Sequence, residues 1–255
     1  MKAVISCTND DKYLFLLPIV AYCWHKIGID IICFSPREMN QKSWLVAMYS
    51  RGQFIGFDCT ENKKATYSQC SRLFAATIKD LPEDEILITS DADMAVFNLP
   101  KYLGDMTIIG ADLVPEKQFP MCYAMAPKWL WKKIMGIGEK SVQECLDDIL
   151  GHIECENMRG NYWGKDQEVL WDKSHPFANL INRARPGTQF ADNRVDRDDI
   201  NWRAYLGPNL IDAHLWRPGY TDENFANILE LLQSQYPNKS FEWLINYRNE
   251  YLKLL

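Results

Sequence analysis

The stretch that decides the fold is ITSDADMAVF, residues 88–97. An apolar run ends at Thr89, two carboxylates follow one residue apart at Asp91 and Asp93, and apolar sequence resumes at Met94. Carboxylates are rarely left in apolar surroundings unless something pairs with them. The partner is either water at a surface turn or a metal ion, and the triplet alone does not decide between them.

The sequence before this stretch predicts alternating strands and helices. Strands are expected at residues 3–7, 30–34, 53–57 and 85–89, and helices at residues 13–27, 41–50 and 67–79. Such alternation is typical of a mostly parallel α/β sheet with crossover helices. Ligands of these sheets bind beyond the carboxyl ends of the strands. Loop 8–10 and the two aspartates are therefore expected at one binding edge.

The pattern after residue 100 is mixed. Strands are expected at residues 107–111 and 121–126, and helices from Pro127 onward and at 142–150, 166–172, 224–235 and 241–254. The segment 177–207 predicts loops and a small strand pair. No linker rich in Pro, Gly or Ser divides the chain, so a single domain is expected over residues 1–255.

Composition narrows the class of protein. The chain of 255 residues is 47% hydrophobic and 24% charged, as in ordinary globular proteins, and its net charge of −6 argues against a nucleic-acid partner. No apolar run approaches the ~20 residues of a transmembrane segment. The eight cysteines form no CxxC pair, which favours reduced thiols in a cytoplasmic protein. His152 and Cys155 could begin a zinc site, but no second ligand pair follows.

The two aspartates and one histidine are the candidate metal ligands. In an extended backbone, residues two apart point to the same face about 6.5–7 Å apart, and a following turn lets Asp91 and Asp93 converge. His214 adds an imidazole in a short apolar stretch, although a lone histidine is more often structural. Together they predict an open site for Mn²⁺ or Mg²⁺ that leaves positions for phosphate oxygens.

Two further polar residues, Asp166 and Arg72, each have two interpretations. Asp166 stands at the start of a predicted helix, where a carboxylate caps the helix or, with Gln167, faces a substrate. Arg72 is either a surface arginine or reaches Asp91 or a diphosphate in bidentate fashion.

In this order, the pieces resemble a nucleotide-sugar glycosyltransferase of the GT-A fold, over residues 1–219. The donor half of that fold is matched by the strand ending in TND at residues 8–10, by the helix with Arg72 and by the strand before DAD at residues 91–93. The DQ pair at 166–167 and His214 are similar to the retaining group that includes glycogenin and bacterial lipopolysaccharide galactosyltransferases. The small size also resembles glycosyltransferases of large DNA viruses.

The resemblance implies a mixed, mostly parallel central sheet flanked by helices. It also implies a nucleotide-sugar-binding half over residues 1–110, an acceptor and catalytic half over 111–220, and C-terminal helices over 221–255. The chain departs from the group in HLWRPG at 214–219, where a glycine and Lys-Pro-Trp are usual, and in MCYAMA at 121–126, where an asparagine-rich strand is usual.

The implied activity is metal-dependent transfer of a hexose or pentose, in the retaining sense, from a UDP- or GDP-sugar to a glycan or other hydroxyl acceptor. The implied metal ligands are Asp91, Asp93 and His214. The implied donor-binding residues are Thr8, Asn9, Asp10, Arg72, Asp91, Ala92 and Asp93. The implied catalytic residues are Asp166 and Gln167, with Asp166 as the base if the reaction inverts configuration.

Two other function classes stay open. A nucleotidyltransferase that makes nucleotide sugars shares the sheet edge and the paired carboxylates, but it usually carries a glycine-rich basic loop, and residues 8–11 hold no glycine. A carbohydrate-binding protein that has lost catalysis would keep the fold, although the intact Asp91, Asp93 and His214 weigh against it.

Overall fold

A computed structural model describes residues 1–37, 40–110, 117–151, 164–184 and 193–255. Its centre is a seven-stranded sheet in the order β3-β2-β1-β4-β7-β6-β8. The strands are β1 (Lys2–Ser6), β2 (Asp30–Pro36), β3 (Gln53–Phe57), β4 (Ile86–Ser90), β6 (Met106–Ile109), β7 (Ala124–Pro127) and β8 (Ile181–Ala184). Only β7 runs antiparallel to its neighbours among these paired strands. The predicted mixed, mostly parallel α/β sheet is confirmed.

The strands are apolar on both faces because helices cover both faces. In β1, Ala3 and Ile5 belong to one hydrophobic cluster and Val4 belongs to a second cluster on the opposite face. All three side chains are fully buried. Successive residues of a strand point to opposite faces, so a parallel strand between two helix layers needs an unbroken apolar run.

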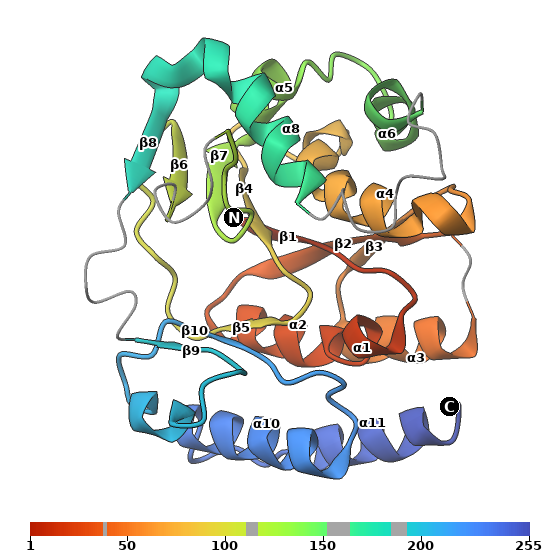
Figure 1. Ribbon diagram of the computed structural model, residues 1–255, viewed down its shortest axis with the longest axis vertical. Coiled ribbons are helices and arrows are strands. Elements are labelled where there is room, and N and C mark those ends of the chain that lie inside the picture. Colours follow the sequence, from red (N-terminus) through yellow and green to blue (C-terminus); the bar gives the residue numbers. More distant parts are fainter. Residues whose placement is uncertain (38–39, 111–116, 152–163, 185–192) are drawn as a thin grey trace.

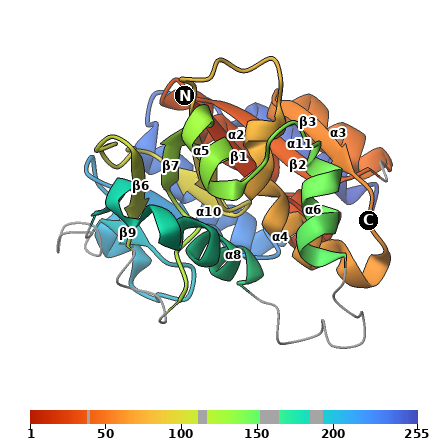
Figure 2. The ribbon, with the colours of Figure 1, turned by 90° about the horizontal axis from the view of Figure 1, so that it is seen from above.

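The helices form a layer on each side of the sheet (Figure 1). On one side lie α4 (Lys64–Ser71), the 3₁₀ helix η2 (Arg72–Thr77), α5 (Lys128–Met135), α6 (Val142–Leu150) and α8 (Lys165–Ser174). On the other side lie α1 (Asp11–Leu14), α2 (Leu17–Lys26) and α3 (Gln41–Ser50), with α10 (Asp222–Gln235) and α11 (Glu242–Leu252) beyond them. Figure 2 shows α5, α6 and α8 in front of the sheet and α10 behind it.

A second, small sheet carries the chain back to the acidic motif. It has the order β5-β10-β9, with β5 (Met94–Val96), β10 (Asp212–His214) and β9 (Arg194–Val195). β5 follows the motif directly, and β10 pairs with it in antiparallel register so that His214 lies opposite Met94. This long-range pairing delivers His214 to the place where Asp91 and Asp93 leave β4.

The C-terminal helix α11 makes hydrogen bonds to both ends of α1. The Tyr251 hydroxyl donates to the Asp11 carboxylate at 2.6 Å, and the Tyr247 hydroxyl donates to the Phe15 carbonyl at 3.0 Å. Lys42 on α3 also donates to Asp11, at 2.9 Å. Two helices, α3 and α11, therefore hold α1, which follows loop 8–10.

Several predicted elements differ from the structure. The helix expected at 13–27 is split into α1 and α2, because Pro18 has no N–H for a continuous helix and occupies the first turn of α2 instead. The helix expected at 67–79 begins earlier, at Lys64, and continues as η2 from Arg72. The strand expected at 121–126 is only Ala124–Pro127. The strands found within 177–207 are β8 and β9, which pair with β6 and β10 and not with each other.

Two predictions from composition have structural counterparts. The seven cysteines within the described residues are free thiols, as expected for reduced cysteines. No helix in the described part of the chain combines the length and the apolar character that crossing a membrane requires.

Candidate functional site

A cavity of about 750 Å³ opens at the carboxyl ends of β1 and β4. This volume is in the range of small-molecule binding sites, about 300–1,000 Å³. Every residue proposed for the site from the sequence lines it, although these residues come from five separate parts of the chain. They are Thr8, Asn9, Asp10, Arg72, Asp91, Ala92, Asp93, Asp166, Gln167 and His214.

The register of β1 and β4 explains why two of these parts meet. Ile5 lies opposite Ser90, the last residue of β4, so loop 8–10 and the acidic motif leave the sheet side by side. Asp10 caps α1 by accepting from the backbone N–H of Lys12 at 2.9 Å. Thr8 accepts from the backbone N–H of Asp10 at 3.3 Å. The loop is thus shaped by its own side chains.

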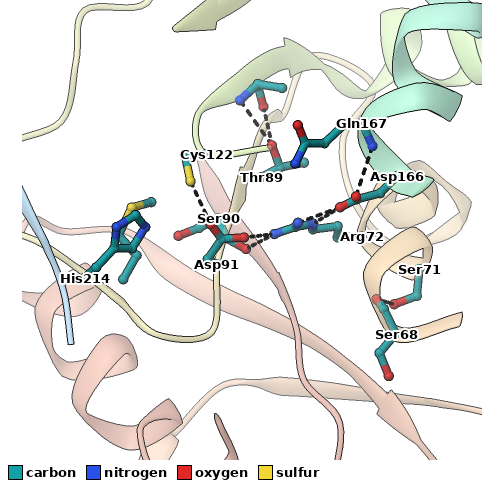
Figure 3. A network of polar contacts seen from close by, with 12 residues as sticks. Ser68, Ser71, Arg72, Thr89, Ser90, Asp91, Cys122, Asp166, Gln167 and His214 are labelled. Atoms are coloured by element: carbon teal, nitrogen blue, oxygen red, sulfur yellow. Dashed lines mark hydrogen bonds and ion pairs between the residues drawn. The ribbon is translucent and has the colours of Figure 1, made fainter. Parts of the chain in front are cut away.

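Arg72 joins the two sides of the cavity (Figure 3). Its guanidinium donates to Asp166 Oδ2 from two nitrogens, at 2.5 and 3.1 Å, and to Asp91 Oδ1 at 2.5 Å. It also donates to the Ser90 carbonyl at 2.8 Å. Arg72 and Asp166 are 8% and 1% exposed, so this is a buried ion-pair network and not a pair of surface charges. Arg72 therefore reaches Asp91, as one of the sequence-based alternatives has it, but through one nitrogen and not in bidentate fashion.

The network moves the pKa values of its two carboxyls in opposite directions. Burial alone would raise the pKa of Asp91, but the Arg72 charge and hydrogen bonds from Cys122 and Arg72 outweigh it and hold this pKa below its usual range. For Asp166, burial dominates and raises the pKa, although Arg72 opposes the shift. Asp91 is therefore the carboxylate that stays ionised towards the cavity.

Asp166 is placed by the start of α8. Gly164 precedes this helix with φ of +88°, a conformation that residues with a Cβ rarely adopt. The Asp166 Oδ1 accepts from the backbone N–H of the next residue, Gln167, at 3.0 Å, while Oδ2 takes the Arg72 donors. The N-cap of α8 is Gly164 and no side chain caps the helix, so Asp166 is not the cap but an acidic residue of the first turn that lines the cavity. The Gln167 side chain lies beside Gly164.

The Asp93 carboxylate pairs with two arginine side chains. Its Oδ2 accepts from Arg197 at 2.5 Å and lies 3.3 Å from the Arg217 Nε. Arg217 in turn lies over the Tyr13 ring, 4.7 Å from the centroid, and donates to the Tyr13 hydroxyl. The side chains of Arg197 and Arg217 are 20% and 25% exposed, and both line the cavity.

A possible metal-binding group lies on the other side of Asp91. The ligand atoms of Asp91, Cys122 and His214 all lie within 4.8 Å of one another, the one such group found among the described residues. The Cys122 thiol donates to Asp91 Oδ2 at 2.7 Å, as Figure 3 shows. Of the three predicted metal ligands, the structure thus brings Asp91 and His214 together in this group and places Asp93 with the arginines. The alternative zinc site at His152 and Cys155 lies outside the described residues.

Arg194 completes the surroundings of His214. It lies 3.4 Å from the His214 Nε2 and forms an ion pair with the buried Asp212 at 2.7 Å. The Tyr123 hydroxyl also donates to Asp212, at 2.6 Å. Burial raises the pKa of Asp212, while Arg194 and Tyr123 oppose that shift.

Sequence reasoning missed Arg197 and Arg217, which line this cavity, and Cys122, which contacts Asp91 beside it. Cys122 was assigned to an apolar strand, whereas the structure places it in the turn before β7. Arg197 lies in a segment whose hydrophobic residues show little periodicity, so nothing in the neighbouring sequence marks it as a site residue. Arg217 could have been found from the sequence, because it stands three residues after His214, in the segment already proposed for the site.

Comparison with known proteins gives the fold a precedent. No protein-family model and no curated protein matches the sequence. Among solved structures, the galactosyltransferase LgtC in complex with donor and acceptor sugar analogues is 13% identical, with a TM-score of 0.50 over 95% of this chain and 99% of that chain. An active-site glutamine-to-glutamate mutant of LgtC is 12% identical, with the same TM-score and coverage.

A second glycosyltransferase, GlyE from Streptococcus pneumoniae TIGR4, is 13% identical with a TM-score of 0.49. The alignment covers 99% of this chain and 63% of GlyE. The likeness to LgtC confirms the predicted GT-A glycosyltransferase fold for this chain.

Proposed function

We propose that this protein is a glycosyltransferase that moves a sugar from a nucleotide-sugar donor to a hydroxyl acceptor and uses a divalent cation. The observation that carries the proposal is the single cavity in which loop 8–10, the acidic motif, the start of α8 and His214 meet. LgtC, which shares the fold, was crystallised with donor and acceptor sugar analogues. A cavity at the carboxyl edge of the sheet is the place where such a fold binds its ligand.

The nucleotide end of the donor fits the side of the cavity next to β1. Thr8, Asn9, Asp10 and Tyr13 line this side and offer hydroxyl, amide and carboxylate groups for a base and a ribose. The diphosphate needs positive charge, and Arg197 and Arg217 supply it from the same cavity.

The residues beside the acidic motif suit a divalent cation. Asp91 keeps an ionised carboxylate there, and His214 adds an imidazole within reach of the same point. These two side chains would hold the cation, and Asp93 would contribute if its arginines moved to the diphosphate. The cation would supply neutralising charge for the diphosphate leaving group.

The sugar end fits the side formed by α8. Both oxygens of Asp166 already accept hydrogen bonds, so its contacts suit a residue that positions Arg72 and Asp91. Gln167 lines the cavity next to it and is the residue we place against the sugar. In a retaining reaction the departing phosphate takes the proton of the acceptor hydroxyl, so no side-chain base is required. The engaged Asp166 therefore favours retention of configuration.

The direct test is a thermal-shift screen of UDP- and GDP-sugars, each with Mn²⁺, with Mg²⁺ and with Co²⁺. A donor that binds only the folded state at 100 times its Kd stabilises it by about 2.7 kcal/mol. Asp91→Asn is expected to abolish the donor-dependent shift, and Asp84→Asn, on an exposed turn, is the matched control. Donors that shift the melting temperature are then incubated with sugar acceptors to detect transfer.

Two outcomes would overturn the proposal. One is that no nucleotide sugar shifts the melting temperature with Mn²⁺, with Mg²⁺ or with Co²⁺. The other is release of pyrophosphate from a nucleoside triphosphate and a sugar phosphate, which would identify a nucleotidyltransferase.

The predicted cytoplasmic location remains a prediction, and fractionation of the source cells would test it.

A further inference from the structure

We propose that Cys122 is the third protein ligand of the cation in this cavity, so that the site selects a cation that accepts sulfur, such as Zn²⁺ or Co²⁺, over Mg²⁺. The inference rests on the proposed function only in placing a cation beside Asp91. It goes beyond that function because it names the ligand set and the class of metal.

Backbone geometry fixes Cys122 beside the acidic motif. The next residue, Tyr123, has φ of +64°, and its backbone N–H donates to the Thr89 carbonyl at 2.9 Å. The backbone N–H of Ala124 donates to the Thr89 hydroxyl at 3.1 Å. The turn is thereby tied to the last residues of β4, and the thiol is directed at Asp91 (Figure 3).

The oxygens of Asp91 divide between two neighbours. Oδ1 accepts from Arg72 at 2.5 Å, and Oδ2 faces the Cys122 thiol at 2.7 Å. A cation bound on the Oδ2 side therefore meets sulfur as well as oxygen. His214 is held at the same point by the pairing of β10 with β5. Asp93 is turned towards Arg197 and Arg217 and does not belong to this group.

The donor set decides which cation fits. One carboxylate oxygen, one imidazole nitrogen and one thiolate sulfur are all ligands that Zn²⁺ takes, and three protein ligands leave a fourth position open. Mg²⁺ instead demands octahedral oxygen coordination. The Cys122 thiol proton now makes a hydrogen bond to Asp91. When the metal binds the sulfur, this proton is released to solvent. Arg194 lies next to His214, but its charge is balanced by the buried Asp212.

Titration of the full chain with Co²⁺, without any nucleotide, tests the ligand set directly. Wild-type protein is expected to show the near-ultraviolet sulfur-to-cobalt charge-transfer band, which Zn²⁺ removes by competition and excess Mg²⁺ does not. Cys122→Ser is expected to lose the band and to weaken Zn²⁺ binding at least tenfold, since loss of an outer-shell partner alone costs about 10–100-fold. Cys59→Ser is the control, because Cys59 is the other half-buried thiol among the described cysteines.

Alkylation of the wild-type chain gives a second measurement that needs no variant. Zn²⁺ is expected to protect Cys122 from iodoacetamide, read by mass spectrometry of its peptide, and to leave Cys59 unprotected. The proposal is overturned if the cobalt band is absent, if it survives Cys122→Ser, or if Zn²⁺ does not slow alkylation of Cys122. Because no donor is present, failure here leaves the glycosyltransferase proposal standing, and success here does not establish it.

Discussion

The two aspartates of the acidic motif lie one residue apart and have opposite surroundings. The Asp91 side chain is 31% exposed, but it belongs to a network whose other members, Arg72 and Asp166, are buried at 8% and 1% exposed. Asp93 faces Arg197 and Arg217, whose side chains are 20% and 25% exposed and line the cavity. We call the first set, Arg72, Asp91 and Asp166, the buried network, and the second set, Asp93, Arg197 and Arg217, the open cluster.

We infer that the charges of the buried network stabilise the fold, whereas those of the open cluster can bind a ligand. Breaking a buried ion pair leaves an uncompensated charge away from water, which is strongly destabilising. The Asp93 carboxylate is only 7% exposed and needs a cation, but it has two partly exposed arginines within reach, so one of them can turn to a ligand while the other stays. The buried network thus fixes the shape of the cavity, and the open cluster is available to an anionic ligand.

Arg72→Leu is expected to have the largest effect. It leaves the Asp166 carboxylate buried without its cation and is expected to lower the free energy of unfolding by about 3–5 kcal/mol, measured by urea denaturation. Arg203→Leu, which removes an exposed arginine from its pair with Glu230, is the matched control and is expected to leave the free energy of unfolding nearly unchanged. Equal losses in the two variants would remove the distinction between the buried network and surface pairs.

Asp91→Asn is expected to show the next largest effect, and one that depends on pH. The pKa of Asp91 in the folded state is lower than in the unfolded chain, so its stabilisation is present above the unfolded pKa of about 3.9 and is lost as pH falls below it. Loss of hydrogen bonds to a charged group predicts a deficit of about 1.5–3 kcal/mol at pH 7. In urea denaturation the deficit relative to wild type should shrink at pH 3. A deficit of the same size at both pH values would contradict the assignment.

Gly164→Ala tests how the buried network is placed. The φ of +88° is unfavourable for alanine, although a Cβ there would meet only Gln167 atoms at 3.6 Å or more, so the cost is backbone strain of about 1 kcal/mol. Gly207→Ala is the control, since a Cβ at Gly207 meets nothing within 4 Å and its φ is not in the left-handed region. Thermal unfolding of both variants checks the prediction, which fails if the two variants behave alike.

Arg217→Ala is expected to change stability least, by less than about 1 kcal/mol, because Asp93 keeps Arg197. Its effect should appear instead in binding of a nucleoside diphosphate with the cation, with affinity falling about tenfold, or about 1.4 kcal/mol. Calorimetric titration measures this, with Arg248→Ala as the control on the surface pair with Asp222. If Arg217→Ala unfolds the protein and leaves binding intact, the open cluster is structural.

The parts of the site that local sequence predicts are those on the regular β1–β4 half. The apolar run ending at Thr89 predicts both β4 and the position of Asp91, and the helical spacing around Arg72 brings that residue towards the same edge. Loop 8–10 follows from the end of β1 in the same way. Each of these placements depends on a short periodic pattern and on the rule for the carboxyl edge of a parallel sheet.

The remaining parts depend on contacts that no local pattern encodes. Cys122 enters the site because Tyr123 adopts a positive φ, and in sequence that turn is indistinguishable from the apolar strand after it. Arg197 is placed by the two-residue strand β9, which is too short to show any alternation. The pairing of Asp93 with Arg197 spans 104 residues, and it decides which aspartate is left for a cation.

The contact between Tyr251 and Asp11 spans 240 residues and bears on the order of events during synthesis. Asp11, the first residue of α1, is synthesised 240 residues before the tyrosine of α11 that donates to it. Contacts of such separation form late because the closure entropy of the intervening chain must be overcome first. The support of α1, which follows loop 8–10, is therefore completed only after translation reaches α11, so a nascent chain carries the acidic motif well before this side of the cavity has all its contacts.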